Sequence, residues 1–286
     1  MSASPHRVHA KFWLLDAPDS IIGQGRRNPD GTGLGYFHAH GAPVIDKEPL
    51  AASADEAFAV EARHVSSTVF LAHVRFATTG ARTVENCHPF VIDDRIFAHN
   101  GAIGGLKQLE ARLGADMTNV RGQTDSERYF ALVSKEIRAH GGDVGAGLQA
   151  AVRWIAANLP VSSMNCVLAT GCELWAFRYP RRHRLYVLER QAGGPHGCRD
   201  VHYTSSALRV HSPHLSEWPS VVVASEPLDD SRGWRLLEPG ELVHVGRNLE
   251  VSSHILIEGR PSYGMLLPTR GVRAWSAISR AIARRR

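Results

Sequence analysis

The feature that most constrains the fold is the order in which two hydrophobic periods follow one another. Near-continuous apolar and β-branched runs, typical of buried strands, occupy residues 67–78 and 95–101. Apolar residues then recur at steps of three and four, which predicts a short amphipathic helix that ends at Gly114. From Val161 the sequence is again typical of β-strands. Strands, helices and strands in this order predict one α+β domain in which two sheets face each other.

Two further helices are expected between these groups of strands. Thr124 or Asp125 can cap a helix that ends at the Gly141–Gly142 pair, and another helix is expected over about 148–159. No low-complexity linker or repeat separates the halves of the chain.

A glycine-rich segment, "NPDGTGLGYF" at 28–37, predicts a turn that enters a strand, and "HAHGAPVI" continues it as a hairpin. The glycine spacing is GxGxG and no helix opens after it, so the dinucleotide-binding fingerprint fails. His38 and His40 lie two apart, but no third ligand is near, so we expect no metal site. The sequence calls for no cofactor.

Composition agrees with a globular domain. Of the 286 residues, 43% are hydrophobic and 21% charged, and no run approaches the roughly 18 apolar residues of a membrane span. Without a leader-like segment, a cytoplasmic location is expected. The four cysteines show no CxxC spacing, which favours reduced thiols.

The formal charge of +5 is unevenly placed, with arginines crowded at 178–184 and at the C-terminus. No recognition motif accompanies them, so we interpret both clusters as solvated surface and expect no nucleic-acid partner. The last segment, 271–286, predicts a basic amphipathic helix that docks on the body of the protein and does not lie on a membrane.

Three short motifs carry chemistry if they converge: "HVRFATTG" at 73–80, "FAHNG" at 97–101 and "TDSE" at 124–127. Arg75 offers a planar fork for a carboxylate, and Asp125 offers a negative charge for an ammonium group. Together they describe a receptor for an α-amino acid. Asn100 and the backbone N–H of Gly101 can supply two donors to a carbonyl oxygen, as in an oxyanion hole.

These motifs, together with "NPDGTGLGYF", "NCHPF" and "ASEPLDD…GWRLLEPGELVHV", resemble the class II (N-terminal nucleophile) glutamine amidotransferases. The likeness is to stand-alone members similar to the ergothioneine-pathway γ-glutamyl amidohydrolase, and it runs in family order from about Phe12 to Val245. The resemblance implies a four-layer αββα sandwich, the N-terminal nucleophile hydrolase fold, with the amidotransferase domain over residues 1–270.

The resemblance also implies roles for individual residues. Arg75 would bind the α-carboxylate of the substrate and Asp125 its α-ammonium group, while Asn100 and Gly101 would form the oxyanion hole. The loop from Thr78 to Arg82 would close over bound glutamine, with Thr78 in contact with it. His99 is expected to pack at the strand end, because the family's base is not a histidine.

The family's nucleophile is a cysteine in second place, whose own α-amino group acts as the base. None of the cysteines is near Met1, and Cys87 cannot carry a free α-amino group. Pro5 and the polar Ser2 and His6 do not suit a buried strand, so we expect the family's first strand to be absent. The natural chain would then start about half a dozen residues upstream, one strand's length.

The leading hypothesis is therefore an amidohydrolase that cleaves the side-chain amide of glutamine or of a γ-glutamyl conjugate, inactive as printed for lack of the cysteine. Released ammonia could pass to a separate partner enzyme. Two alternatives stay open. One is a hydrolase that uses Ser2 after removal of Met1, and the other is a non-catalytic homologue that only binds glutamine.

Overall fold

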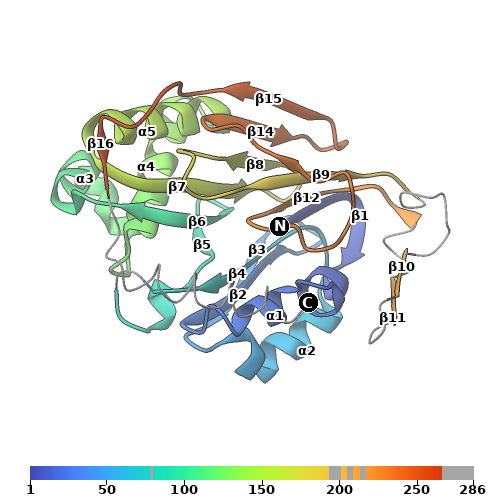
Figure 1. Ribbon diagram of the computed structural model, residues 1–286. Coiled ribbons are helices and arrows are strands. Elements are labelled where there is room, and N and C mark those ends of the chain that lie inside the picture. Colours follow the sequence, from blue (N-terminus) through green and yellow to red (C-terminus); the bar gives the residue numbers. More distant parts are fainter. Residues whose placement is uncertain (78–79, 193–200, 205–208, 213–216, 266–286) are drawn as a thin grey trace, which may run out of the picture.

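Two stacked β-sheets lie between two groups of helices, which gives the four layers αββα (Figure 1). The computed structural model describes residues 1–77, 80–192, 201–204, 209–212 and 217–265. This architecture confirms the fold class expected from the sequence.

The first sheet has seven strands in the order β13-β9-β12-β1-β4-β2-β3, and every pair in it is antiparallel. Its strands are Arg235–Leu236 (β13), Tyr186–Arg190 (β9), Ser220–Ala224 (β12), Ser2–His9 (β1), Ser66–Arg75 (β4), Gly31–Phe37 (β2) and Pro43–Glu48 (β3).

The second sheet runs in the order β15-β14-β8-β7-β6-β5, and β16 pairs in parallel with β7. Its strands are Val251–Ile255 (β15), Glu241–Val245 (β14), Leu174–Phe177 (β8), Pro160–Ala169 (β7), Arg95–Ile103 (β6), Phe90–Ile92 (β5) and Tyr263–Gly264 (β16). A separate hairpin joins Val201–Thr204 (β10) to Arg209–Ser212 (β11).

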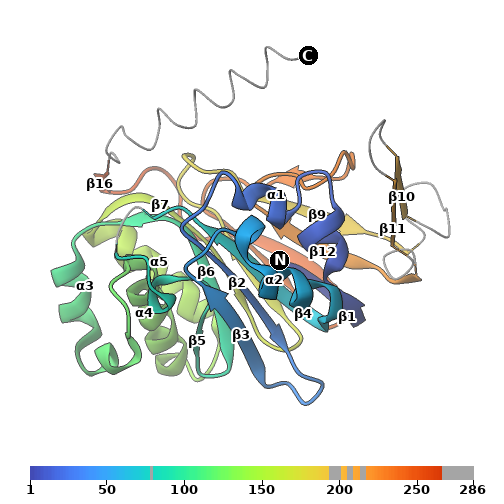
Figure 2. The same ribbon diagram turned by 90° about the horizontal axis from the view of Figure 1, so that it is seen from below.

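Helices cover the outer face of each sheet (Figure 2). The second sheet is covered by Leu106–Leu113 (α3), Asp125–Ala139 (α4) and Val144–Asn158 (α5). The first sheet is covered by Ile21–Gly25 (α1), Glu56–His64 (α2) and a π-helical turn, Phe12–Asp16. Three 3₁₀ turns are also present, at Ala52–Ala54, Val84–Asn86 and Gly114–Asn119.

A third apolar cluster fills the space between the two sheets. It contains Val69 and Leu71 of β4 and Ile96 and Ala98 of β6. Because alternate residues of a strand share a face, Arg75, four residues beyond Leu71 on β4, and Asn100, two residues beyond Ala98 on β6, belong to the same interlayer faces. The sheets therefore carry polar residues at the end of their shared core.

The expectation that the first strand is absent is wrong. Residues 2–9 form β1, which lies between β4 and β12 in the centre of the first sheet. Ala3 and Val8 are buried, whereas Pro5 lies in an exposed bulge where the register against β4 shifts. A residue in a bulge does not donate to the hydrogen-bond ladder, so Pro5 costs no hydrogen bond there. The segment can therefore form a strand although its sequence is not typical of one.

The GxGxG segment serves packing. Gly31, Gly33 and Gly35 alternate along β2, so they share one face. A Cβ on Gly33 would lie 2.0 Å from the carbonyl oxygen of His88, and one on Gly35 would lie 2.9 Å from Cγ of Pro89. Because these glycines have no side chains, residues 87–89 can pack directly against β2.

Two sequence expectations concern residues outside those that the structure describes. They are the C-terminal helix at 271–286, with the domain boundary at 270, and the position of Thr78. Within the described ranges, no helix has the length and apolar character needed to cross a membrane.

Candidate active site

Arg75 ends β4 with a buried side chain, only 4% exposed. Its Nη1 donates to the carbonyl oxygen of Ala81 at 3.3 Å and its Nη2 to that of Gly80 at 3.5 Å. Its backbone carbonyl accepts from Asp30 N–H at 3.0 Å, which fixes the strand end against the turn before β2. The guanidinium is thus held where the two sheets meet, facing backbone oxygens of the loop that follows β4.

Asp125 is the first residue of α4 and is 3% exposed. The helix begins where the sequence predicts, because the Thr124 hydroxyl accepts from Glu127 N–H at 3.3 Å. The Asp125 carboxylate accepts a hydrogen bond from Ile103 N–H at 2.8 Å. This bond fastens the helix start to β6, two residues beyond Gly101.

Asn100 and Gly101 lie on β6 opposite Asn165 and Met164 of β7. The Asn100 side-chain amide donates to the Ser225 hydroxyl at 3.1 Å. A Cβ on Gly101 would lie 2.0 Å from the Ser163 carbonyl oxygen, so only glycine fits there. The close packing fixes the backbone at the position expected to stabilise an oxyanion.

The loop after β4 joins Arg75 to the segment before Asp125. Ala81 N–H donates to the Gln123 side chain at 3.2 Å, and Asn86 donates to the Ala81 carbonyl at 3.0 Å while accepting from Gln123 N–H at 2.7 Å. Asn86 is 1% exposed. Arg75 and Asp125 are therefore linked through Ala81 and Gln123, although they lie on different layers.

His99 is buried, and both of its ring nitrogens have partners. Nε2 lies 2.9 Å from the Ser163 carbonyl oxygen and Nδ1 lies 2.9 Å from the Ser126 hydroxyl. Burial lowers the pKa of His99, although the negative charge of Asp125 acts in the other direction and raises it. A neutral ring that donates from Nε2 to the carbonyl and accepts at Nδ1 fits this environment, which agrees with the expected packing role.

Two further histidines, half-buried His73 and buried His88, lie near this group. The rings of His73 on β4 and His88 are 4.2 Å apart. Burial lowers the pKa of His73 to about 3, and it holds the pKa of His88 well below its usual value. Nδ1 of His73 and both ring nitrogens of His88 lack hydrogen-bond partners among the described residues. Arg75 and His99 both lie near enough to His73 to disfavour its protonation, so the end of β4 is close to β6.

Neither Cys87 nor Cys166 supplies a thiolate. Burial raises the pKa of the Cys87 thiol, whose Sγ lies 3.4 Å from the Thr83 carbonyl oxygen. Burial also raises the pKa of Cys166 to about 12. Both are protonated at neutral pH, so neither is activated as a nucleophile.

Ser2 is 1% exposed and lies opposite Phe70 of β4 and Val222 of β12. Ser225, the partner of Asn100, lies three residues beyond Val222, about 10 Å along an extended chain. The structure therefore does not bring Ser2 to the oxyanion pair.

Sequence reasoning assigned no role to Ser225 or Asn86, although both lie in motifs that carry the family resemblance. Their roles depend on contacts between distant segments, 125 residues apart for Asn100 and Ser225. The spacing of residues along the chain gives no signal for such contacts.

Comparisons with known proteins identify the family of the chain. Residues 20–256 match the family model described as class II glutamine amidotransferases. The uncharacterised protein MJ1515 of Methanocaldococcus jannaschii is 27% identical over 76% of this chain and 61% of its own length. YafJ of Escherichia coli, a candidate glutamine amidotransferase by name, is 24% identical over 74% of this chain and 83% of its own length.

A class II glutamine aminotransferase domain protein of Silicibacter pomeroyi shares the fold. Its solved structure aligns with a TM-score of 0.59 and 23% identity, over 89% of this chain and 97% of that one. The chain spans less than two thirds of the length of MJ1515. On the family match over most of its length, the chain belongs to the class II glutamine amidotransferases.

Proposed function

We propose that the protein hydrolyses the side-chain amide of glutamine, or of a γ-glutamyl conjugate, between its two sheets. The observation that carries this proposal is the 2.8 Å hydrogen bond from Ile103 N–H to Asp125. It puts a buried carboxylate two residues along β6 from the Asn100–Gly101 pair. An ammonium site and an oxyanion site next to one another suit an amino acid whose reactive carbonyl lies a few atoms away.

Substrate binding uses the charges at the two ends of the site. The Arg75 guanidinium binds the α-carboxylate as a planar fork, and Asp125 binds the α-ammonium group. The carbonyl oxygens of Gly80 and Ala81 now accept from Arg75, so the incoming carboxylate would replace them as the acceptor. Thr78 would contact the substrate from the same loop.

Catalysis uses the two donors on β6. A thiolate attacks the amide carbonyl, and the oxygen that becomes negative accepts hydrogen bonds from Asn100 Nδ2 and Gly101 N–H. The C–N bond then breaks, and nitrogen leaves as ammonia, or as the amine of a conjugate, with the proton taken from the thiol. Water attacks the resulting thioester, which releases glutamate and regenerates the thiol.

We propose that the thiol belongs to a cysteine on residues that continue β1 beyond Met1. The register of the strands supports this placement. Met1 and Val223 exchange two 2.8 Å ladder hydrogen bonds, so the position two residues before Met1 falls opposite Ser225. Ser2 pairs with Phe70, so the position four residues before Met1 falls opposite Arg75 on β4. A strand continued in this way passes both the oxyanion donor and the guanidinium.

The ammonia would be released or passed to a separate partner enzyme. The match to YafJ supports a free-standing domain, because it covers 83% of that protein. The Arg75–Asp125 clamp recognises the amino-acid end that glutamine and γ-glutamyl conjugates share, so both substrate types remain in the proposal.

A non-catalytic glutamine-binding protein is the second candidate. It is favoured by one observation: the described thiols Cys87 and Cys166 are held protonated by burial. A hydrolase that uses Ser2 is a third candidate, and the distance of Ser2 from Ser225 along the strands argues against it.

Two chains separate these candidates: the printed chain and one that carries the upstream codons of its gene. Calorimetry measures L-glutamine binding, and coupled assays measure ammonia and glutamate. Turnover by the extended chain alone supports the cysteine hydrolase. Turnover by the printed chain supports Ser2, and binding without turnover by both chains supports the non-catalytic protein. No binding by either chain contradicts the proposed site.

A further inference from the structure

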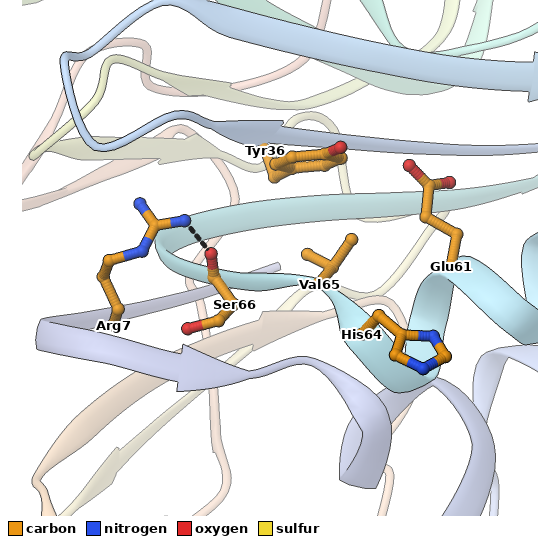
Figure 3. A pocket seen from close by; sticks show the side chains of 6 residues that line it. All are labelled: Arg7, Tyr36, Glu61, His64, Val65 and Ser66. Atoms are coloured by element: carbon orange, nitrogen blue, oxygen red, sulfur yellow. Dashed lines mark hydrogen bonds between the residues drawn. The ribbon is translucent and has the colours of Figure 1, made fainter.

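A pocket lies on the outer side of the first sheet, among α2, β1 and β2 (Figure 3). It has a volume of about 300 Å³ and is lined by Arg7, Tyr36, Glu61, His64, Val65 and Ser66. None of these residues belongs to the site between the sheets. A volume of this size is at the lower end of the range for small-molecule sites.

Opposite charges form the two ends of the pocket. Arg7 donates to the backbone carbonyls of Phe37 at 3.1 Å and of Ser66, and it makes no ion pair with any described residue. These bonds hold the guanidinium in place without neutralising it. Figure 3 shows Glu61 at the other end, with the Tyr36 ring and Val65 between the two.

Glu61 has an unsatisfied acceptor. Its Oε2 is shielded from solvent and accepts no hydrogen bond within the part of the chain that the structure describes. Burial, with the charge of Asp46 on β3, raises the pKa of Glu61 to about 7. The Tyr36 hydroxyl and the Asp46 carboxylate lie beside the same carboxyl group, which holds Glu61 at this end of the pocket.

We propose that this pocket binds a small molecule with an anionic group at one end and an amine at the other. Arg7 holds the anionic group and Glu61 the amine, and the Tyr36 ring with Val65 contacts an apolar chain between them. Because the Tyr36 ring and Val65 lie between Arg7 and Glu61 (Figure 3), we expect a ligand whose two charged groups are further apart than those of an α-amino acid.

Titration of Glu61 gives the site a pH dependence. Asp46 faces Glu61 from β3, Tyr36 from β2 and Asp55 from the N-cap of α2, while Arg7 and His64 line the same pocket. An ammonium group binds the ionised carboxylate better than the protonated one. Affinity for the amine should therefore increase as the pH rises from 6 to 8.

Calorimetry with ω-amino acids tests the proposal, using 4-aminobutanoate, 5-aminopentanoate and 6-aminohexanoate as a ruler of length. We expect at least one to saturate the protein and to bind at least tenfold more tightly than hexanoate or hexylamine. Arg7→Gln and Glu61→Gln should each weaken that binding at least tenfold, and Glu61→Gln should remove its pH dependence. Arg63→Gln and Glu56→Gln, on α2 but outside the pocket lining, are the matched controls.

Arg75→Ala tests whether the ω-amino acid binds instead at the site between the sheets. We expect this variant to bind the ω-amino acid as tightly as the unmodified protein does. Should Arg7→Gln fail to fold, NMR shifts of the Val65 methyl and Ser66 amide groups of the unmodified protein report occupancy directly. The proposal is overturned if no ω-amino acid saturates the protein or shifts those signals. It is also overturned if hexylamine binds as tightly as the two-ended ligands.

Discussion

The side-chain amide of Asn100 on β6 donates a 3.1 Å hydrogen bond to the hydroxyl of Ser225, which follows β12. This bond joins the two sheets at the end of their shared core. It also holds the amide beside the C-terminal end of β12, where the antiparallel strand β1 begins. The donor expected to stabilise an oxyanion is thus held by the opposite sheet.

Ser225→Ala should free the Asn100 amide to rotate. Loss of one neutral hydrogen bond costs about 1 kcal/mol, so we expect kcat to fall severalfold with little change in KM. Ammonia release by the upstream-extended chain measures both constants, and Ser252→Ala on exposed β15 is the control. A severalfold rise in KM with unchanged kcat would show that Ser225 contacts the substrate and does not orient Asn100.

Arg75→Ala and Asn100→Ala should affect different kinetic constants. Arg75→Ala should weaken glutamine binding, because the guanidinium contacts a carboxylate that does not react. Asn100→Ala should lower kcat about 10²–10³-fold, since an oxyanion donor contributes roughly 2.7–4 kcal/mol to the transition state. Calorimetry of glutamine binding and steady-state kinetics separate the two effects. The opposite pattern would reverse the assigned roles.

Gly33→Ala should destabilise the fold. The new Cβ would lie 2.0 Å from the His88 carbonyl oxygen, so backbone must shift at a cost of about 1–3 kcal/mol. Urea unfolding measures the loss. Gly264→Ala is the control, since nothing lies within 4 Å of a Cβ there. Equal urea midpoints for the two variants would mean that packing of residues 87–89 against β2 does not require glycine at position 33.

Half-buried His73 and buried His88 should make the protein sensitive to acid. Both have folded-state pKa values below the ordinary 6.5, so below that pH the unfolded chain binds protons that the folded chain does not. Stability is therefore lost as the pH falls below about 6.5, by roughly 2 kcal/mol for His73 between pH 7 and pH 5.

Urea midpoints across this pH range test the effect. His73→Gln should show a flatter dependence than the unmodified protein, while exposed His64→Gln should keep the original slope. An unchanged slope in His73→Gln would mean that His73 is already protonated in the folded state.

Much of the fold is predictable because its main elements each carry their own signal. β4 and β6 are long buried runs, and α4 has Thr124 as a side-chain cap. The helix α2 escapes prediction because only Phe58 and Ala62 are buried on it, too few positions to show a period.

The misread elements depend on tertiary context. β1 tolerates Pro5 through a bulge that only its neighbours define. Arg178, read as a surface charge, is 5% exposed and donates to the His183 carbonyl at 2.9 Å. The apolar run around 148–159 does not mark the start of α5, because the helix begins at Val144, after the Asp143 cap.

Likewise, the sequence predicts the chemistry of Arg75, Asp125, Asn100 and Gly101, but not the groups that hold them. Asn86 and Ser225 act through side-chain bonds between segments far apart in the chain. Such bonds form only when the layers of the fold pack together, so the residues near Asn86 or Ser225 in the sequence do not predict them.

A crystal structure with bound L-glutamate, the product of the proposed reaction, tests the central claim most directly. We predict its α-carboxylate on Arg75, its α-ammonium group on Asp125 and its side-chain carboxylate within hydrogen-bond distance of Asn100 and Gly101. Glutamate bound elsewhere, or turned so that its α-carboxylate meets Asn100, would contradict the proposed site.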